Sequence, residues 1–355
     1  MNGASLSGTT LNLNTAFTNG GGFHATNCHL TNCEWNGNYL LSPKGLGGGG
    51  YVSGVSTVSN CQFTGNNGGD GAGLHLIGEG TVVNSTFDGN IAINQGGGLR
   101  TLGNTQTISG CKFLGNSAST GGGMRTDQGS QRITHCEFSG NTATGVGGGL
   151  TALDDNMKID NSLFSGNSSG DHGGGASIFW GAVTNCTFSG NRATNEGGAL
   201  SSTAQSSTLA CQNSIFWNNE AGAEINTQSA TAHQVNSGFF SFQNCIVHNS
   251  GGSGDWMFGP QYLDLGNNLD TSPSFAMPVL PSDAPTQSGN FRLFPGSQAL
   301  DTGNNLADLD AVLAGTDTIA DVPTDLSGNA RIQNTIVDLG AYENATTCLL
   351  YTSPS

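Results

Sequence analysis

A seven-residue motif, with an aromatic residue at its centre and Gly-Asn at its end, recurs along the first 250 residues of the chain. Successive copies start 24 to 31 residues apart, and a glycine-rich motif such as GGGL lies between neighbours. A unit this short cannot bury a core by itself, so consecutive units must stack on one another. The copies are NCEWNGN (32–38), NCQFTGN (60–66), NSTFDGN (84–90), GCKFLGN (110–116), HCEFSGN (135–141), NSLFSGN (161–167), NCTFSGN (185–191), NSIFWNN (213–219) and the degraded NCIVHNS (244–250).

Within each copy the pattern has the period of a strand. In QRITHCEF (131–138), residues two positions apart share one side, which places Cys136 and Phe138 inside and Glu137 outside. Gly and Asn tolerate the left-handed backbone that sharp corners need. Parallel crossovers are almost always right-handed. We therefore predict an all-β fold, a right-handed parallel β-helix solenoid of roughly ten coils.

Stacking in register turns each sequence column into a ladder along the solenoid. We predict an inward aromatic ladder, a second apolar ladder after the glycine-rich motif, and an asparagine ladder whose amides bond from coil to coil. The aromatic ladder is Trp35, Phe63, Phe87, Phe113, Phe138, Phe164, Phe188 and Phe216; the apolar one is Phe23, Tyr51, Leu74, Leu99, Met124, Leu150, Ala176 and Leu200; the amide one is Asn66, Asn90, Asn116, Asn141, Asn167 and Asn191.

Composition changes after residue 250, where most of the prolines lie. We predict β-helix repeats over 1–250 and, over 251–345, a segment that caps the last hydrophobic coil. Residues 16–23 already resemble half a coil with no leader before them, so we expect the natural protein to extend upstream, with its export signal there. Residues 346–355 resemble translated sequencing-adapter read-through, and we expect no structural role for them.

Charge limits the possible partners. The chain has 25 acidic and nine basic residues and a formal net charge of -16, which disfavours nucleic acid as a partner. No apolar run approaches the roughly 18 residues of a membrane-spanning helix. We expect a monomer with no membrane span in this chain.

The repeats resemble those of pectin-lyase-like β-helix proteins and of polymorphic outer membrane proteins. The segment 265–343, with FRLFPGS (291–297) and DLGAYE (338–343), is similar to the end of exported bacterial β-helix proteins with a choice-of-anchor Q domain. The resemblance implies a bacterial protein that is extracellular or associated with the outer membrane. The repeat motif is specific for the architecture but says little about the activity.

Six of the nine cysteines share a column with serines, which indicates a small inward side chain. Buried free thiols are favoured over the disulfides Cys33–Cys61 and Cys111–Cys136. No cofactor and no metal site are predicted; calcium at the corner 65–73 is conceivable, but a plain corner is favoured. The column is Cys33, Cys61, Ser85, Cys111, Cys136, Ser162, Cys186, Ser214 and Cys245.

Catalysis on a polysaccharide would need two carboxylates facing one groove, or a base with acids that hold a cation. The best candidates are Asp127, Asp154 and Asp155, near Arg100 and Arg125. Asp154 and Asp155 occupy a predicted turn, and the motifs of polygalacturonases and pectate lyases are not present in order. Solvated turn acids are favoured, and no catalytic residue is predicted.

His75, Arg100 and Arg125 follow the glycine-rich motif on three consecutive repeats, in a column expected to face outward. Stacked like charges are destabilising unless neutralised, and local neutralisation by Glu79 and Asp127 is the favoured explanation. The alternative is an anion-binding stripe for a uronate or sulfate group of a glycan. These three residues are the predicted ligand-binding site.

Taken together, the favoured hypothesis is an exported bacterial surface or secreted scaffold, adhesin-like or glycan-binding and non-catalytic, with an acidic glycan or cell-surface polysaccharide as partner. The alternative is a polysaccharide lyase or glycoside hydrolase of the pectin-lyase-like superfamily.

Overall fold

The computed structural model describes residues 2–344 except 104, 154–155, 203, 205–206, 223–233, 237–238, 306, 308–323 and 334. The predicted non-structural tail, 346–355, lies outside the described residues. Among the described elements, no helix is both long and apolar enough to cross a membrane.

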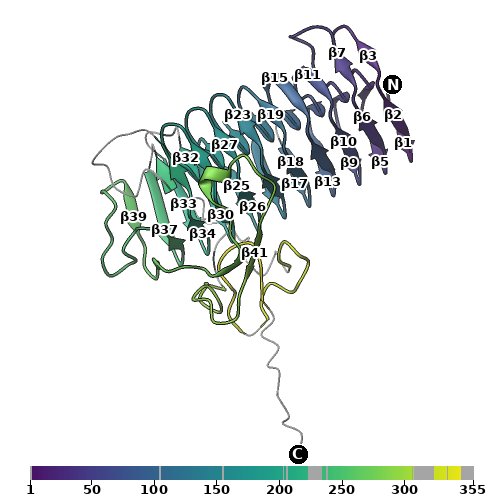
Figure 1. Cartoon of the computed structure of the whole chain (residues 1–355). Helices are drawn as coiled ribbons and strands as arrows, with labels where there is room; N and C mark the ends of the chain where they lie inside the picture. Colours follow the sequence, from purple (N-terminus) through teal and green to yellow (C-terminus); the bar gives the residue numbers. More distant parts are fainter. Residues whose placement is uncertain are drawn as a thin grey trace, which may run out of the picture.

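The chain winds as a β-helix in which each coil contributes one short strand to each of four parallel sheets (Figure 1). Each strand in the interior of a sheet pairs with its equivalents one coil before and one coil after, as β10 does with β6 and β14. The N-terminal coil lies at one end of the rod and β39 at the other (Figure 1). The predicted all-β parallel solenoid of about ten coils is confirmed.

We number the sheets by their first strand. Sheet 1 contains β1 (Ser5–Ser7), β5 (His29–Thr31), β9 (Ser56–Ser59), β13 (Gly80–Val83), β17 (Thr105–Ser109), β21 (Ser130–Thr134), β25 (Met157–Asp160), β29 (Gly181–Thr184), β33 (Thr208–Gln212), β37 (Phe239–Gln243) and β39 (Tyr262–Asp264). Sheet 2 contains β2 (Thr10–Asn12), β6 (Glu34–Asn36), β10 (Gln62–Thr64), β14 (Thr86–Asp88), β18 (Lys112–Leu114), β22 (Glu137–Ser139), β26 (Leu163–Ser165), β30 (Thr187–Ser189), β34 (Ile215–Trp217) and β38 (Ile246–Val247).

The other two large sheets complete each coil. Sheet 3 contains β3 (Thr15–Ala16), β7 (Tyr39–Leu40), β11 (Asn67–Asp70), β15 (Ile91–Gln95), β19 (Ser117–Ala118), β23 (Thr142–Ala143), β27 (Ser168–Ser169), β31 (Arg192–Ala193) and β35 (Glu220–Ala221). Sheet 4 contains β4 (Phe23–Thr26), β8 (Gly50–Ser53), β12 (Leu74–Ile77), β16 (Leu99–Leu102), β20 (Met124–Asp127), β24 (Leu150–Ala152), β28 (Ala176–Ile178), β32 (Leu200–Ser202) and β36 (Val235–Asn236).

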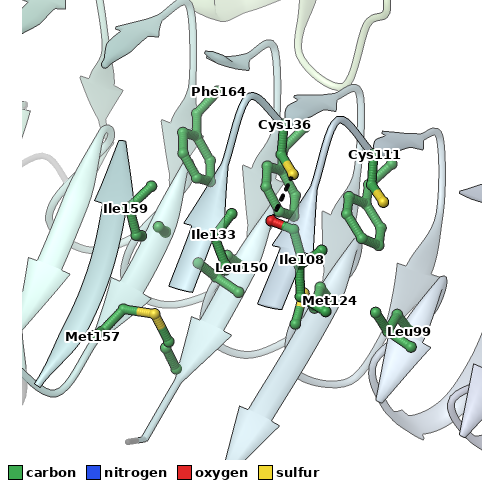
Figure 2. Packing of buried hydrophobic residues seen from close by; sticks show 14 of the residues in the cluster. Leu99, Ile108, Cys111, Met124, Ile133, Cys136, Leu150, Met157, Ile159 and Phe164 are labelled. Atoms are coloured by element: carbon green, nitrogen blue, oxygen red, sulfur yellow. Dashed lines mark hydrogen bonds between the residues drawn. The ribbon is translucent and has the colours of Figure 1, made fainter. Parts of the chain in front are cut away.

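The core of the rod is a stack of aromatic rings. From Trp35 to Phe216 each predicted ring lies on the next, with centroids between 4.5 and 5.2 Å apart. Figure 2 shows Phe164 of this stack together with the isoleucine, leucine and methionine side chains that fill the rest of the interior. The predicted aromatic ladder is therefore confirmed.

The second apolar ladder is correct except at one position. Phe23 pairs in register with Gly50, and Gly50 with Leu74, so Tyr51 stands in the adjacent column. The cause is an extra glycine in the motif GGGGY (47–51). A Cβ on Gly50 would fall 1.8 Å from the ring of Phe23, which shows that the aromatic ring occupies the space that the missing side chain leaves.

The asparagine ladder is confirmed and extends further than predicted. Each side-chain amide donates to the side-chain oxygen of the next coil, as Asn116 does to Asn141 at 3.0 Å. The same amide of Asn116 also donates to the backbone oxygen of Phe87. Asn38 and Asn219 continue the ladder at its two ends. The buried amides therefore have hydrogen-bond partners, and they also bond to backbone groups at the corners of each coil.

The eight described cysteines are all buried and unbridged, which agrees with the predicted free thiols. Figure 2 shows Cys136 with its thiol directed to the backbone oxygen of Ile108, 3.6 Å away. Burial raises the pKa of Cys61 to about 11. A thiol that stays protonated is a poor nucleophile and metal ligand, so the column is structural.

The C-terminal segment differs from a simple cap. Parallel pairing continues past residue 250, since β39 joins β37. Phe258 and Tyr262 complete the core at that end, as expected of a cap. The chain then turns back along the outer face of sheet 2, where β40 (Phe275–Met277), the 3₁₀ helix η1 (Pro281–Asp283) and β41 (Asn290–Leu293) lie beside the solenoid (Figure 1).

A separate hydrophobic cluster holds this segment on the solenoid. It joins Leu163, Ile215 and Ile246, which point outward from sheet 2, to Phe275, Val279, Phe291, Leu293, Ala299 and Leu339. The DLGAYE motif is part of the same packing. Its Glu343 is buried against Arg331, with 3.4 Å between carboxylate and guanidinium, and burial raises the pKa of Glu343 to about 8.

Stability should depend on the aromatic stack far more than on the outward residues. Phe138→Ala removes a fully buried ring, leaves a cavity between two neighbours and should lower the free energy of unfolding by about 3–5 kcal/mol. Gln62→Ala, on the exposed side of the same sheet, should cost less than about 0.5 kcal/mol. Urea denaturation compares the two variants, and equal losses would mean that inside and outside have been exchanged.

Candidate functional site

The predicted ligand-binding residues His75, Arg100 and Arg125 stack on consecutive strands of sheet 4. The expectation that they face solvent is wrong for His75, 1% exposed, and for Arg100, 6% exposed; Arg125 is largely buried too. The cause is the glycine-rich corner between sheets 3 and 4, which runs over the column. A Cβ on Gly71 or Gly121 would lie 2.9 Å from the Cβ of Arg100 or Arg125.

Asp127 neutralises both arginines, as the favoured explanation predicted. Its carboxylate forms an ion pair with Arg100, and it lies 3.2 Å from the guanidinium of Arg125. Arg125 also donates to the Thr120 hydroxyl at 2.8 Å, and Arg100 to its neighbour's backbone oxygen. Glu79, the other predicted partner, is exposed. The column is a buried ion-pair network, which leaves little of it open to a ligand.

His75 is an uncharged member of this network. Its ring is stacked on Tyr51, with centroids 5.6 Å apart, and neither ring nitrogen has a hydrogen-bond partner. Burial, reinforced by the charge of Arg100, lowers the pKa of His75 to about 3. A buried neutral imidazole beside a guanidinium contributes packing and no charge.

Asp127 is therefore expected to be essential for stability. Asp127→Asn leaves two buried guanidinium groups without their shared carboxylate and should lower the free energy of unfolding by about 3 kcal/mol. Glu79→Gln removes one exposed carboxylate from the same region and should cost less than about 0.5 kcal/mol. Chemical denaturation measures both, and equal effects would contradict the pairing.

The buried His75 also predicts how stability depends on pH. The unfolded chain binds a proton at His75 near pH 6.5 and the folded chain only near pH 3, so stability is complete above pH 6.5 and falls as the pH drops. The loss from this group between neutral pH and pH 5 should be about 2 kcal/mol.

Replacing the histidine separates this effect from other titrating groups. His75→Gln should remove that part of the pH dependence in urea melts. His29→Gln, at an exposed position, is the matched control and should behave like the parent protein. Identical pH profiles for parent and His75→Gln would refute the buried neutral state.

The predicted alternative catalytic acids do not form a described site. Asp127 is engaged by two arginines, and Asp154 and Asp155 lie outside the described residues. The corner 65–73, considered for calcium, contains strand β11 with a bulge. Among the described residues, no group of three or more His, Cys, Asp or Glu side chains is placed to hold a metal ion.

A polar cleft of about 630 Å³ lies elsewhere, between the solenoid and the C-terminal segment. One wall is formed by the corner between sheets 1 and 2, and the other by the C-terminal segment. The first wall contains Asn84, residues 109–112, His135 and Glu137, and the second contains residues 324–328 and Tyr342. A smaller hollow of about 90 Å³ shares Glu137 and Tyr342 with it. The size is typical of small-ligand sites.

One cation and one aromatic ring line this cleft, and a second cation contacts two of its lining residues. Lys112, 57% exposed, pairs with Glu137 at 3.0 Å. Arg292 lies 5.9 Å from the ring centroid of Tyr342 and donates to the Ser327 hydroxyl at 2.8 Å. Burial raises the pKa of Tyr342, so its hydroxyl stays protonated and able to donate a hydrogen bond. The lining can thus present a cation, hydroxyls and an aromatic ring to a ligand.

The carboxylates of the cleft are already engaged. Glu137 is bound to Lys112. Asp325 is fully buried and accepts backbone N–H groups from Ser327, Asn329 and Glu343 at 2.7 to 2.9 Å. Among the described lining residues no further Asp or Glu occurs. The arrangement gives a ligand hydrogen-bond donors rather than the pair of free carboxylates that hydrolysis needs.

The cleft was not predicted from the sequence, although two signals point to it. Outward positions of sheet 2 change from polar residues to Leu163, Ile215 and Ile246, which predicts a covered face. His135 is the one histidine in a column otherwise made of Asn and Gly, and it adopts the same left-handed conformation, with φ of 53°. Both signals mark the border of the covered face.

Comparison with protein-family models supports the architecture. A family model described as "Right handed beta helix region" matches residues 97–269, which confirms the predicted right-handed β-helix. Among solved structures, that of the pectate lyase Pel9A aligns with 91% of this chain and 73% of its own, at 16% sequence identity and a TM-score of 0.43. No curated protein matches the chain.

Proposed function

We propose that this protein is an exported bacterial β-helix scaffold that binds an acidic glycan in the cleft without cleaving it. The observation that carries the proposal is the make-up of the cleft: a lysine paired with a glutamate and an aromatic ring line it, an arginine contacts two of its lining residues, and both lining carboxylates are engaged. The resemblance to exported β-helix proteins supports a location on the cell surface or outside the cell.

The charges favour an acidic ligand. In a chain with a formal net charge of -16, Lys112 lines the cleft and Arg292 bonds to its lining residue Ser327. A guanidinium can bind a uronate carboxylate or a sulfate through two parallel hydrogen bonds. Tyr342 adds a flat apolar face with a hydroxyl at its edge, which suits a ligand with both apolar and polar surface.

A glycan array with acidic and neutral oligosaccharides tests this proposal. Lys112→Ala combined with Arg292→Ala should weaken binding of acidic glycans about tenfold or more, equivalent to about 1.4 kcal/mol, and added salt should weaken binding by the parent protein. Lys44→Ala combined with Arg192→Ala removes the same charge from exposed positions outside the cleft and should leave binding unchanged.

Product analysis on the same glycans separates binding from catalysis. We expect neither new reducing ends nor unsaturated products. Release of either product would favour the alternative, a lyase or hydrolase. Equal binding by the parent protein and by the variant with both Lys112→Ala and Arg292→Ala would show that the cleft is not the glycan-binding site.

A further inference from the structure

The small hollow of about 90 Å³ beside the cleft lies between the outer face of sheet 2 and the segment that covers it. Its floor is formed by outward side chains of β22 and β26, and its roof by residues 287–291. The roof is held at both ends, because the Thr286 N–H donates to the Gly166 oxygen at 2.9 Å and Phe291 packs in the hydrophobic cluster of the C-terminal segment. The hollow is therefore a fixed part of the fold.

The floor of the small hollow offers a hydroxyl proton. Ser139 and Ser165 are buried, and their hydroxyl oxygens lie 2.6 Å apart. Two hydroxyls contain two protons, and the hydrogen bond between them uses one. Among the contacts of the described residues, the second proton has no acceptor. An oxygen atom of a ligand in the hollow would accept it, and the short serine side chains leave room for that atom.

Size and composition decide which kind of group fits the small hollow. The volume corresponds to about three water molecules, so one small substituent fits and a whole sugar residue does not. The roof adds the polar side chains of Gln287, Ser288 and Asn290. The described lining residues include no lysine, arginine or histidine, and Glu137 supplies their one carboxylate. This composition favours a neutral substituent that carries a hydroxyl group.

Glu137 determines the charge that the small hollow accepts. Its carboxylate lines both the hollow and the cleft, whereas Lys112, its ion-pair partner at 3.0 Å, lines the cleft only. A ligand carboxylate placed in the hollow would meet the like charge of Glu137 and no lining cation, which is costly in a buried site. A neutral hydroxyl avoids this cost and can donate to the Glu137 carboxylate.

We propose that the small hollow is a subsite for the primary hydroxyl group of a neutral hexose, next to an acidic sugar whose charged group lies at Lys112. A uronate carries a carboxylate where a neutral hexose carries this hydroxyl. The ligand is then a glycan in which neutral hexoses lie next to uronates, and Glu137 is the specificity-determining residue that rejects a chain of uronates alone. This inference rests on the proposed function, because it requires that the cleft bind an acidic glycan.

Three oligosaccharides of equal length test the subsite by isothermal titration calorimetry. The first alternates glucuronate with glucose, the second alternates glucuronate with 6-deoxyglucose, and the third contains glucuronate only. The parent protein should bind the second about tenfold more weakly than the first, because the buried hydroxyls lose their partner. It should bind the third at least as weakly as the second, although the third carries more negative charge.

Two variants locate the effect in the small hollow. Ser139→Leu introduces the residue that stands one coil earlier in the same column, Leu114, and fills the hollow. This variant should bind the first and second oligosaccharides equally, with the affinity that the parent has for the second. Thr64→Leu makes an apolar substitution at an exposed position of the same column, outside both the hollow and the cleft, and should behave like the parent.

Glu137→Gln gives a second measurement that does not require the hollow to be filled. Loss of the like charge should narrow the preference of the parent for the first oligosaccharide over the third, and an unchanged preference would show that Glu137 does not reject uronates. Equal binding of the first two oligosaccharides by the parent, or the same discrimination between them in Ser139→Leu, would overturn the subsite while the cleft remains the binding site. No binding of any of the three would overturn the proposed function and the subsite with it.

Discussion

In-register stacking of parallel coils is the constraint on which the rest of this structure depends. Each inward side chain meets its equivalent one coil away, so a column must consist of groups that can pack on copies of themselves. Phenylalanine rings do so with centroids as close as 4.5 Å, and asparagine amides do so by donating to one another. The interior is therefore nearly one-dimensional, and a change in one coil acts mainly on its two neighbours.

The same stacking explains why an outward direction does not guarantee exposure. Glycine corners lie close enough to cover the column of His75 and Arg100, and they bury charges that a simple strand pattern places in solvent. Burying two guanidinium groups is tolerated because Asp127 accepts both. The column thus packs beneath the glycine-rich corner. In a fold of this kind, positively charged residues in one sequence column do not by themselves indicate a binding surface.

How far the sequence predicts the structure follows from the range of each interaction. The aromatic and asparagine ladders depend on contacts one coil away, and the repeat displays them directly. The repeat pattern alone places Tyr51 one column away from its true position, because one inserted glycine shifts the register by a residue. The docking of the described residues between 275 and 343 joins parts of the chain far apart in sequence, and only the apolar outward residues Leu163, Ile215 and Ile246 indicate it.

The position of the cleft follows from where that docking ends. Outward residues of sheet 2 are polar in the early coils and covered in the later ones, so the segment leaves a hollow at the border, near Lys112 and Glu137. The corner column at this border needs a residue that tolerates positive φ, and histidine is among the few besides glycine that adopt it readily. A histidine can therefore replace asparagine there without disturbing the ladders, and its longer side chain reaches Thr324 across the junction. In a repeat protein, such a position at the edge of a covered face is where a titratable group can be introduced at least cost to the core.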